Sequence, residues 1–119
     1  MSSHPINLGL RLLLELSILA SMGYWGWTEH AGAWRFVWAV GTPLAAAALW
    51  GTFRVPNDPG NAPVPVPGAV RLLLEALLFA AAVGLLVAAG RQGIAIGLGA
   101  VIVLHYAVSY DRVAWLLRQ

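Results

Sequence analysis

The chain has 119 residues, 60% of them hydrophobic and 10% charged, and its mean hydropathy is +0.75. Soluble domains carry about 25% charged residues, so this composition excludes an ordinary soluble domain and indicates a chain solvated by lipid. The absence of cysteine excludes disulfides and thiol redox chemistry, and the net charge of +2 rests on scattered arginines rather than a basic stripe, which argues against a nucleic-acid partner.

The first predicted span covers residues 8–27. Its length at about 1.5 Å per residue gives about 30 Å, which matches the hydrocarbon thickness of a bilayer. The span ends in Tyr24, Trp25 and Trp27, an aromatic group of the kind found at membrane interfaces. A cleaved signal peptide is the alternative, but Glu15 interrupts the apolar stretch and the aromatic residues make a poor cleavage site.

The second predicted span covers residues 36–53 and carries Pro43 near its middle. A proline inside a helix removes one backbone hydrogen bond and bends the helix. We expect the Thr42 hydroxyl to bond a carbonyl that the proline leaves unpaired. We interpret Pro43 as a kink that serves packing, with a gating hinge as the alternative.

Residues 54–68 form the long connection of the chain and contain five of its seven prolines. Proline-rich segments adopt stiff polyproline II structure, so we predict a rigid spacer between two helical hairpins. A proline-rich ligand for a partner protein is the alternative.

The third and fourth predicted spans cover residues 69–89 and 94–112. Gly93 and Gly97 have the GxxxG spacing that lets a neighbouring helix approach closely, and we interpret them as a packing face within the chain. The predicted fold is therefore all-α: an integral membrane four-helix bundle of two hairpins that forms a single transmembrane domain over residues 1–119.

The arginines predict the orientation of the four spans. Both termini and the proline-rich connection share one side of the membrane, which carries five arginines: Arg11, Arg54, Arg71, Arg112 and Arg118. The two short turns share the other side, which carries Arg35 and Arg91. Because positively charged loops stay in the cytoplasm, we predict a multi-pass protein of a bacterial cytoplasmic membrane with both termini cytoplasmic.

One pentapeptide occurs twice, since Arg11-Leu-Leu-Leu-Glu15 recurs letter for letter as Arg71-Leu-Leu-Leu-Glu75. Each copy places a cation and a carboxylate one helical turn apart, where they can pair. The identity barely extends past these five residues, so it is thin evidence for a duplication.

Glu15, Glu75 and His105 lie at similar depths from the cytoplasmic ends of their spans. In a compact bundle they would form one polar layer in the cytoplasmic half. Four further polar residues would join them: Arg11, Arg71, Ser109 and Asn7. Ionisable groups avoid lipid, so these side chains are expected to face the interior of the bundle.

Two interpretations of this layer stay open. In the structural one, each glutamate is held by its own arginine and the network fixes the helix register. In the functional one, the carboxylates and His105 form a proton or small-ligand site. No catalytic residue, metal or cofactor is predicted: no Glu-x-x-His motif is present, and His4 and His30 lie outside the spans on opposite sides.

Several segments together resemble the YrdB family of small four-span bacterial membrane proteins of unknown function. They are the stretch from Asn7 to Glu15, the run from Gly23 to Gly26, the run from Leu49 to Phe53, the proline-rich connection and the Arg71 to Glu75 copy. The resemblance covers most of the chain from Asn7 to about Gly90. It implies the fold and the location and contributes no activity.

The sequence favours small-solute or proton-coupled binding or transport through the polar layer. The alternative is an accessory or structural subunit of a larger membrane complex, in which the Arg-Glu pairs are purely structural. An enzyme is the least favoured class because no nucleophile motif is visible. The expected partners are the lipid bilayer and either a second copy, since four short helices rarely enclose a path alone, or a larger membrane complex.

Overall fold

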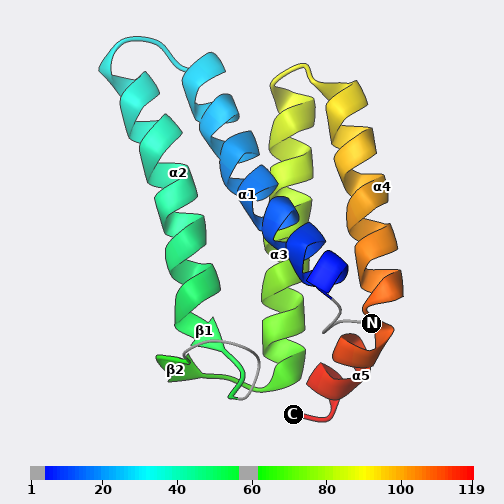
Figure 1. Cartoon of the computed structure of the whole chain (residues 1–119). Coiled ribbons are helices and arrows are strands. Elements are labelled where there is room, and N and C mark those ends of the chain that lie inside the picture. The colour runs from blue at the N-terminus through cyan, green and yellow to red at the C-terminus, as the bar shows by residue number, and fades with distance from the viewer. Residues whose placement is uncertain (1–4, 57–61) are drawn as a thin grey trace.

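The structure is a computed structural model that describes residues 5–56 and 62–119. The described residues form an all-helical fold with one very short pair of strands (Figure 1). Its elements are α1 (Pro5–Thr28), α2 (Ala33–Thr52), β1 (Phe53–Arg54), β2 (Val64–Pro65), α3 (Gly68–Ala88), α4 (Gln92–Val108) and α5 (Tyr110–Leu117). The all-α class is thus confirmed.

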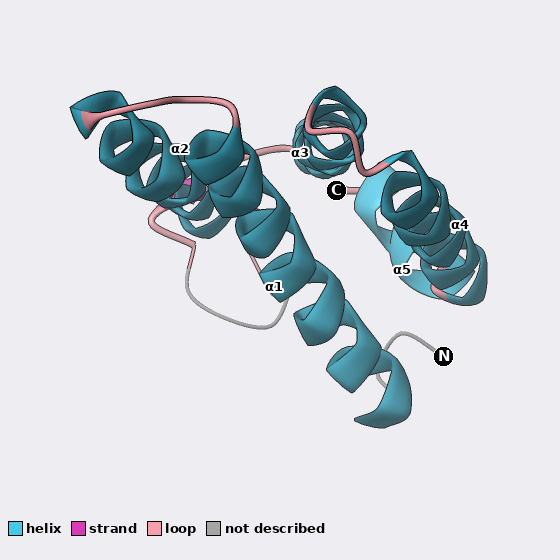
Figure 2. Ribbon diagram, turned by 90° about the horizontal axis from the view of Figure 1, so that it is seen from above, coloured by secondary structure: helices cyan, strands magenta, loops and turns pink. Residues whose placement is uncertain are grey.

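Helices α2, α3 and α4 run between two ends of the molecule, and α1 crosses them obliquely (Figures 1 and 2). The α1–α2 and α3–α4 turns lie at one end, and the start of α1, the strand pair and α5 lie at the other. Helix α1 is inclined to its neighbours: it packs along α2, crosses α3, and reaches α4 with its amino-terminal end (Figures 1 and 2). It therefore ties the two hairpins together.

Helices α1 and α3 are each long and apolar enough to cross a membrane. Helices α4 and α5 would add a third span if the bent pair is counted as one. Among the described residues this indicates membrane association, with two or three spans by length and composition.

The predicted fourth span, residues 94–112, is wrong as a single helix. Helix α4 ends at Val108, and α5 leaves it at 70°. The break falls at Ser109, whose backbone N–H closes the last turn of α4 on the His105 carbonyl and whose side chain is held by Asn7. The apolar run ends at the same point, where Tyr110 begins a shorter and more polar helix.

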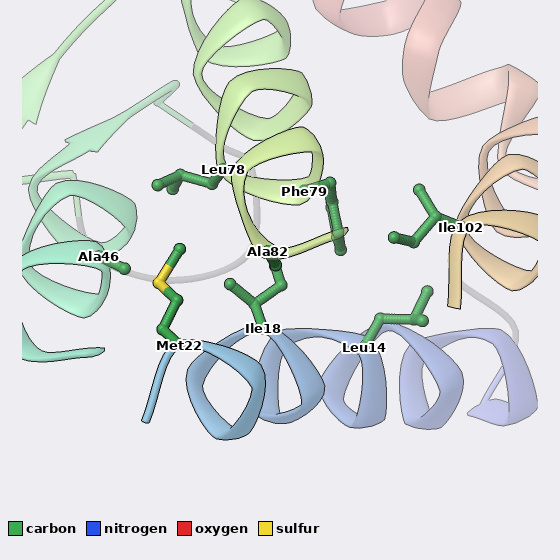
Figure 3. Close-up of a cluster of buried hydrophobic side chains, with 8 residues drawn as sticks. All are labelled: Leu14, Ile18, Met22, Ala46, Leu78, Phe79, Ala82 and Ile102. Atoms are coloured by element: carbon green, nitrogen blue, oxygen red, sulfur yellow. The ribbon is translucent and has the colours of Figure 1, made fainter. Parts of the chain in front are cut away.

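The apolar core lies where α1 crosses α3 (Figure 3). Leu14, Ile18 and Met22 follow one another at intervals of four, so they form one stripe on α1. Figure 3 shows this stripe directed at Leu78, Phe79 and Ala82 of α3, with Ala46 of α2 and Ile102 of α4 on either side. Burial of these side chains holds the helices together without any polar contact.

Two glycines mark close approaches between backbones. A Cβ on Gly26 would overlap the backbone of Trp38 and Ala39, so Gly26 lets α1 and α2 cross tightly. A Cβ on Gly68 would overlap the backbone of Leu116, so Gly68 lets α5 lie directly against the start of α3. Neither contact can form if a side chain replaces the hydrogen.

The close packing predicted within the chain at Gly93 and Gly97 is wrong for the described residues. No neighbouring atom lies within 4 Å of the place where a Cβ would stand on either glycine. Helix α4 instead buries the face that carries Ala95, Ile102 and His105, and the two glycines lie off that face.

Pro43 lies inside α2 and faces α1, with its ring 3.7 Å from the place of a Cβ on Gly23. This is a packing contact. The predicted bond from the Thr42 hydroxyl is wrong, because this buried oxygen has no hydrogen-bond partner among residues 5–56 and 62–119.

The proline-rich connection partly departs from the predicted spacer. Val64–Pro65 pairs in parallel with Phe53–Arg54, and the Val66 N–H donates to the Arg54 carbonyl at 2.9 Å. The connection is therefore fastened to the end of α2. Its residues 57–61 lie outside the described part of the chain.

Candidate functional site

A closed cluster of four side chains surrounds Glu75, and we call it the Glu75 network: Arg71, Glu75, Tyr106 and Arg112. Glu75 Oε2 accepts hydrogen bonds from Arg71 Nε and Arg112 Nη2, both at 2.8 Å. Glu75 Oε1 accepts from the Tyr106 hydroxyl at 2.6 Å and from Arg112 Nη1 at 3.0 Å. Both carboxylate oxygens are thus engaged twice, and Arg112 binds the carboxylate with both of its terminal nitrogens.

Three helices supply the Glu75 network. Arg71 and Glu75 lie one turn apart at the start of α3, so their pairing is local. Tyr106 comes from the last turn of α4. Arg112 comes from the first turn of α5, which the 70° bend directs back across the start of α3. The network therefore depends on the break at Ser109.

Arg71 also joins α3 to α2. Its Nη1 donates to the carbonyls of Trp50 at 2.5 Å and Phe53 at 2.9 Å. These carbonyls lie at the end of α2, where helical backbones leave acceptors unpaired and where a positive charge is stabilised. The guanidinium also lies 4.6 Å from the centroid of the Trp50 ring, a cation–π contact.

Burial separates this cluster from solvent. The side chain of Arg71 is 0% exposed, that of Glu75 is 1% exposed and that of Arg112 is 7% exposed. Buried charges are tolerated only when they are paired and hydrogen-bonded, which is the case for the Glu75 carboxylate. The arrangement has the form of a structural lock, with no free carboxylate oxygen for a ligand.

A second polar cluster joins the start of α1 to the end of α4. The Asn7 side-chain amide donates to Ser109 Oγ at 2.8 Å, and its Oδ1 accepts from His105 Nδ1 at 3.2 Å. All three residues are buried. Because Asn7 Oδ1 can only accept, Nδ1 of His105 carries the hydrogen.

The first pentapeptide copy is more exposed than the second. Arg11 Nε and Glu15 Oε1 are 3.4 Å apart, and their side chains are 14% and 28% exposed. Glu15 lines a half-open groove of about 210 Å³ between α1 and α2. The carboxylate is therefore reachable, unlike that of Glu75.

The predicted polar layer thus divides into three parts. Arg71 and Glu75 belong to the Glu75 network, Asn7, His105 and Ser109 form the second cluster, and Arg11 pairs with Glu15. Among the described residues, no three His, Asp or Glu side chains gather as metal ligands would.

The sequence reasoning missed two members of the Glu75 network. Tyr106 is not among the residues predicted to form the polar layer, and Arg112 is counted only among the arginines that predict the orientation. The signal for both was the change from apolar to polar residues after Val108, which marks the bend. The carbonyls of Trp50 and Phe53 as partners of Arg71 carried no sequence signal.

The chain was compared with known proteins. Residues 9–103 match the model of a family described as proteins of unknown function, DUF2568. An uncharacterized protein of Bacillus subtilis (strain 168), YrdB, is 37% identical over 116 residues, which cover 95% of this chain and 94% of that protein. No solved structure matches the chain.

Proposed function

The chain belongs to the DUF2568 family, and from that premise we propose that it is a four-span protein of a bacterial cytoplasmic membrane. In this proposal α1, α2, α3 and α4 cross the bilayer as one domain of two hairpins, and α5 lies at the cytoplasmic surface. The 20 residues of α2 correspond to about 30 Å, enough to cross a hydrocarbon core despite its lower hydropathy.

The distribution of side chains over the two ends supports this placement. Arg54, Arg71 and Arg112 lie at the end of the molecule that carries the strand pair and α5 (Figure 1). The opposite end carries aromatic residues at the end of α1 and the start of α2, including Trp27, on which Arg35 stacks at 4.7 Å. Arginines favour the cytoplasmic side and tryptophans favour the interface, so both features fit cytoplasmic termini.

The absence of cysteine makes the topology directly testable. A membrane-impermeant maleimide added to intact spheroplasts is expected to label Ala31→Cys in the α1–α2 turn and to spare Gln119→Cys until the membrane is opened. Labelling of Gln119→Cys in intact spheroplasts would overturn the proposed orientation.

For the role of the protein, the geometry best supports an accessory or structural membrane subunit. The observation that carries this proposal is the saturation of Glu75, whose two oxygens accept four hydrogen bonds while the side chain is 1% exposed. A proton or solute pathway needs a carboxylate that exchanges partners with water or cargo. A structural role needs a carboxylate whose hydrogen-bond partners are fixed, as those of Glu75 are.

Solute binding or transport remains the second candidate, and one observation favours it. Glu15 is 28% exposed on the α1–α2 groove and so keeps access to a ligand. Transport would therefore use the first pentapeptide copy and not the common layer of both glutamates.

The decisive experiment compares Glu75→Gln with Glu15→Gln in the purified protein. A structural role for Glu75 predicts a large loss of stability in Glu75→Gln and a retained fold in Glu15→Gln. A subunit role further predicts that cross-linking in native membranes captures the chain in a complex with a second copy or a larger assembly, and that Glu75→Gln reduces this capture. A Glu75→Gln protein with unchanged stability would refute the structural role.

A further inference from the structure

The α1–α2 groove is a half-open, apolar depression that the Glu75 network does not use. It is lined by Leu16 and Leu19 of α1 and by Ala46, Ala47 and Trp50 of α2. Its volume of about 210 Å³ exceeds the space that one water needs. Small side chains on α2 create this space, because Ala46 and Ala47 stand opposite leucines.

One acidic side chain lines the groove. Glu15 carries a single ion-pair contact, the 3.4 Å approach of Arg11, and accepts no hydrogen bond from the described residues. Glu75, with the same neighbours in sequence, accepts four. The Glu15 carboxylate therefore has unused acceptor capacity, and that capacity lies beside apolar surface.

The order of groups along α1 limits what can bind. Arg11 lies nearest the cytoplasmic end, Glu15 follows one turn deeper, and Leu19 lies one turn deeper again. A molecule that lays its hydrocarbon against Leu19 and Ala46 brings its polar end to Glu15. A phospholipid would place its phosphate there, against a carboxylate, whereas a cation is attracted.

We propose that the α1–α2 groove binds a single-chain cationic amphiphile, with its ammonium group on Glu15 and its alkyl chain between α1 and α2. Arg11 is the residue that competes with the ligand for Glu15, so binding exchanges a loose internal ion pair for an external one. The site rests on the membrane placement proposed above, since the groove then opens toward lipid in the cytoplasmic half.

The test uses the full chain in nanodiscs of phosphatidylcholine, with 2-bromododecyltrimethylammonium, whose bromine lies beside the ammonium group, as the probe. The bromine quenches tryptophan fluorescence on contact, and Trp50 lines the groove while the other tryptophans do not. We expect saturable quenching that weakens at least about tenfold in Glu15→Gln, because a charge-assisted contact is lost. Glu29→Gln, the same change at an exposed glutamate in the α1–α2 turn, is the matched control and should bind normally.

Two further experiments distinguish binding in the groove from general partitioning of the probe into the bilayer. Ala47→Leu narrows the groove and should abolish saturable quenching, whereas Ala48→Leu on the same helix lies outside the lining and should not. The uncharged probe bromododecanol should show no saturation. Equal saturation by both probes, or an unchanged affinity in Glu15→Gln, would overturn the proposal, whereas failure of the chain to enter nanodiscs would instead refute the membrane placement.

Discussion

The two copies of Arg-Leu-Leu-Leu-Glu have the same sequence and opposite surroundings. In the first copy, Arg11 and Glu15 are 3.4 Å apart and partly exposed. In the second, Arg71 and Glu75 are 2.8 Å apart and fully buried, and Arg112 binds the same carboxylate. The pentapeptide spacing brings arginine and glutamate together in both places. The neighbouring helices determine how deeply each pair is buried and which further side chains bind the carboxylate.

The difference has a specific structural origin. The second copy begins three residues after Gly68, the first residue of α3, so α5 can pack against the helix start and bring Arg112 to Glu75. The first copy lies inside α1, where the neighbouring surface is the apolar groove with Ala46 and Ala47. The second copy therefore forms a buried structural network, and the first copy presents an accessible carboxylate.

The largest predicted effect comes from removing the charge of Glu75. Glu75→Gln leaves Arg71 and Arg112 buried against a neutral amide, so we expect a loss of about 3–5 kcal/mol in the free energy of unfolding. Glu15→Gln, the identical change in the first copy, should lose about 1 kcal/mol or less, because its partner is partly solvated. Reversible unfolding in mixed micelles measures both, and equal losses would contradict the distinction between the copies.

The next largest effect tests the contact between Gly68 and α5, which brings Arg112 to Glu75. Gly68→Ala forces a methyl group into the backbone of Leu116, so we expect about 2–3 kcal/mol of destabilisation. Gly9→Ala is the matched control, since Gly9 lies just before the first copy and a Cβ there meets no atom within 4 Å. That control should be neutral or stabilising by up to about 1 kcal/mol, because alanine favours the helix.

A loss of stability in Gly68→Ala does not by itself show that α5 has moved, because alanine also changes the start of α3. Cross-linking of Val70→Cys to Leu117→Cys, which lie on the two elements that meet at this contact, reports whether α5 has moved away. Retained cross-linking together with retained stability in Gly68→Ala would show that α5 does not need the close approach.

A smaller effect is expected from Tyr106→Phe. The change removes one hydrogen bond to Glu75 Oε1 while Arg71 and Arg112 remain, so we expect about 1.5 kcal/mol of destabilisation, at the low end for a bond to a charged group. Tyr24→Phe removes a hydroxyl that accepts from Arg91 in an exposed position and should change stability by less than about 0.5 kcal/mol. Thermal unfolding in one detergent compares the two variants directly.

The helices themselves were predictable from the sequence because apolar runs of bilayer length alternate with glycine and proline. The predicted spans overlap α1, α2, α3 and α4 closely, and the Arg71 to Glu75 pairing follows from a spacing of four. These features are local, so neighbouring residues contain the information that specifies them.

The predictions that are wrong concern contacts between segments that are distant in the sequence. Gly93 and Gly97 have a packing motif, yet a Cβ on either would meet no atom of the described residues within 4 Å, whereas Gly26 and Gly68 have no such motif and lie at the tight contacts. The Ser109 side chain at the bend accepts a hydrogen bond from Asn7, about one hundred residues earlier, which no local pattern could indicate. The same bend directs α5 so that Arg112 reaches Glu75.

The smallest expected effect is the coupling free energy between Arg11 and Glu15. Its comparison with the coupling free energy between Arg71 and Glu75 tests the difference between the two copies most directly. A double-mutant cycle with Arg11→Gln and Glu15→Gln should give a coupling of about 0.5 kcal/mol or less, because a partly exposed pair at 3.4 Å gains little over water. The same cycle with Arg71→Gln and Glu75→Gln should give a coupling several times larger, because each single change there leaves a buried group without its partner. Raising the salt concentration should erase the first coupling and leave the second, since buried pairs are poorly screened. If both cycles gave the same coupling, the pentapeptide alone would set the strength of the pair, and neither α5 nor the groove would matter to it.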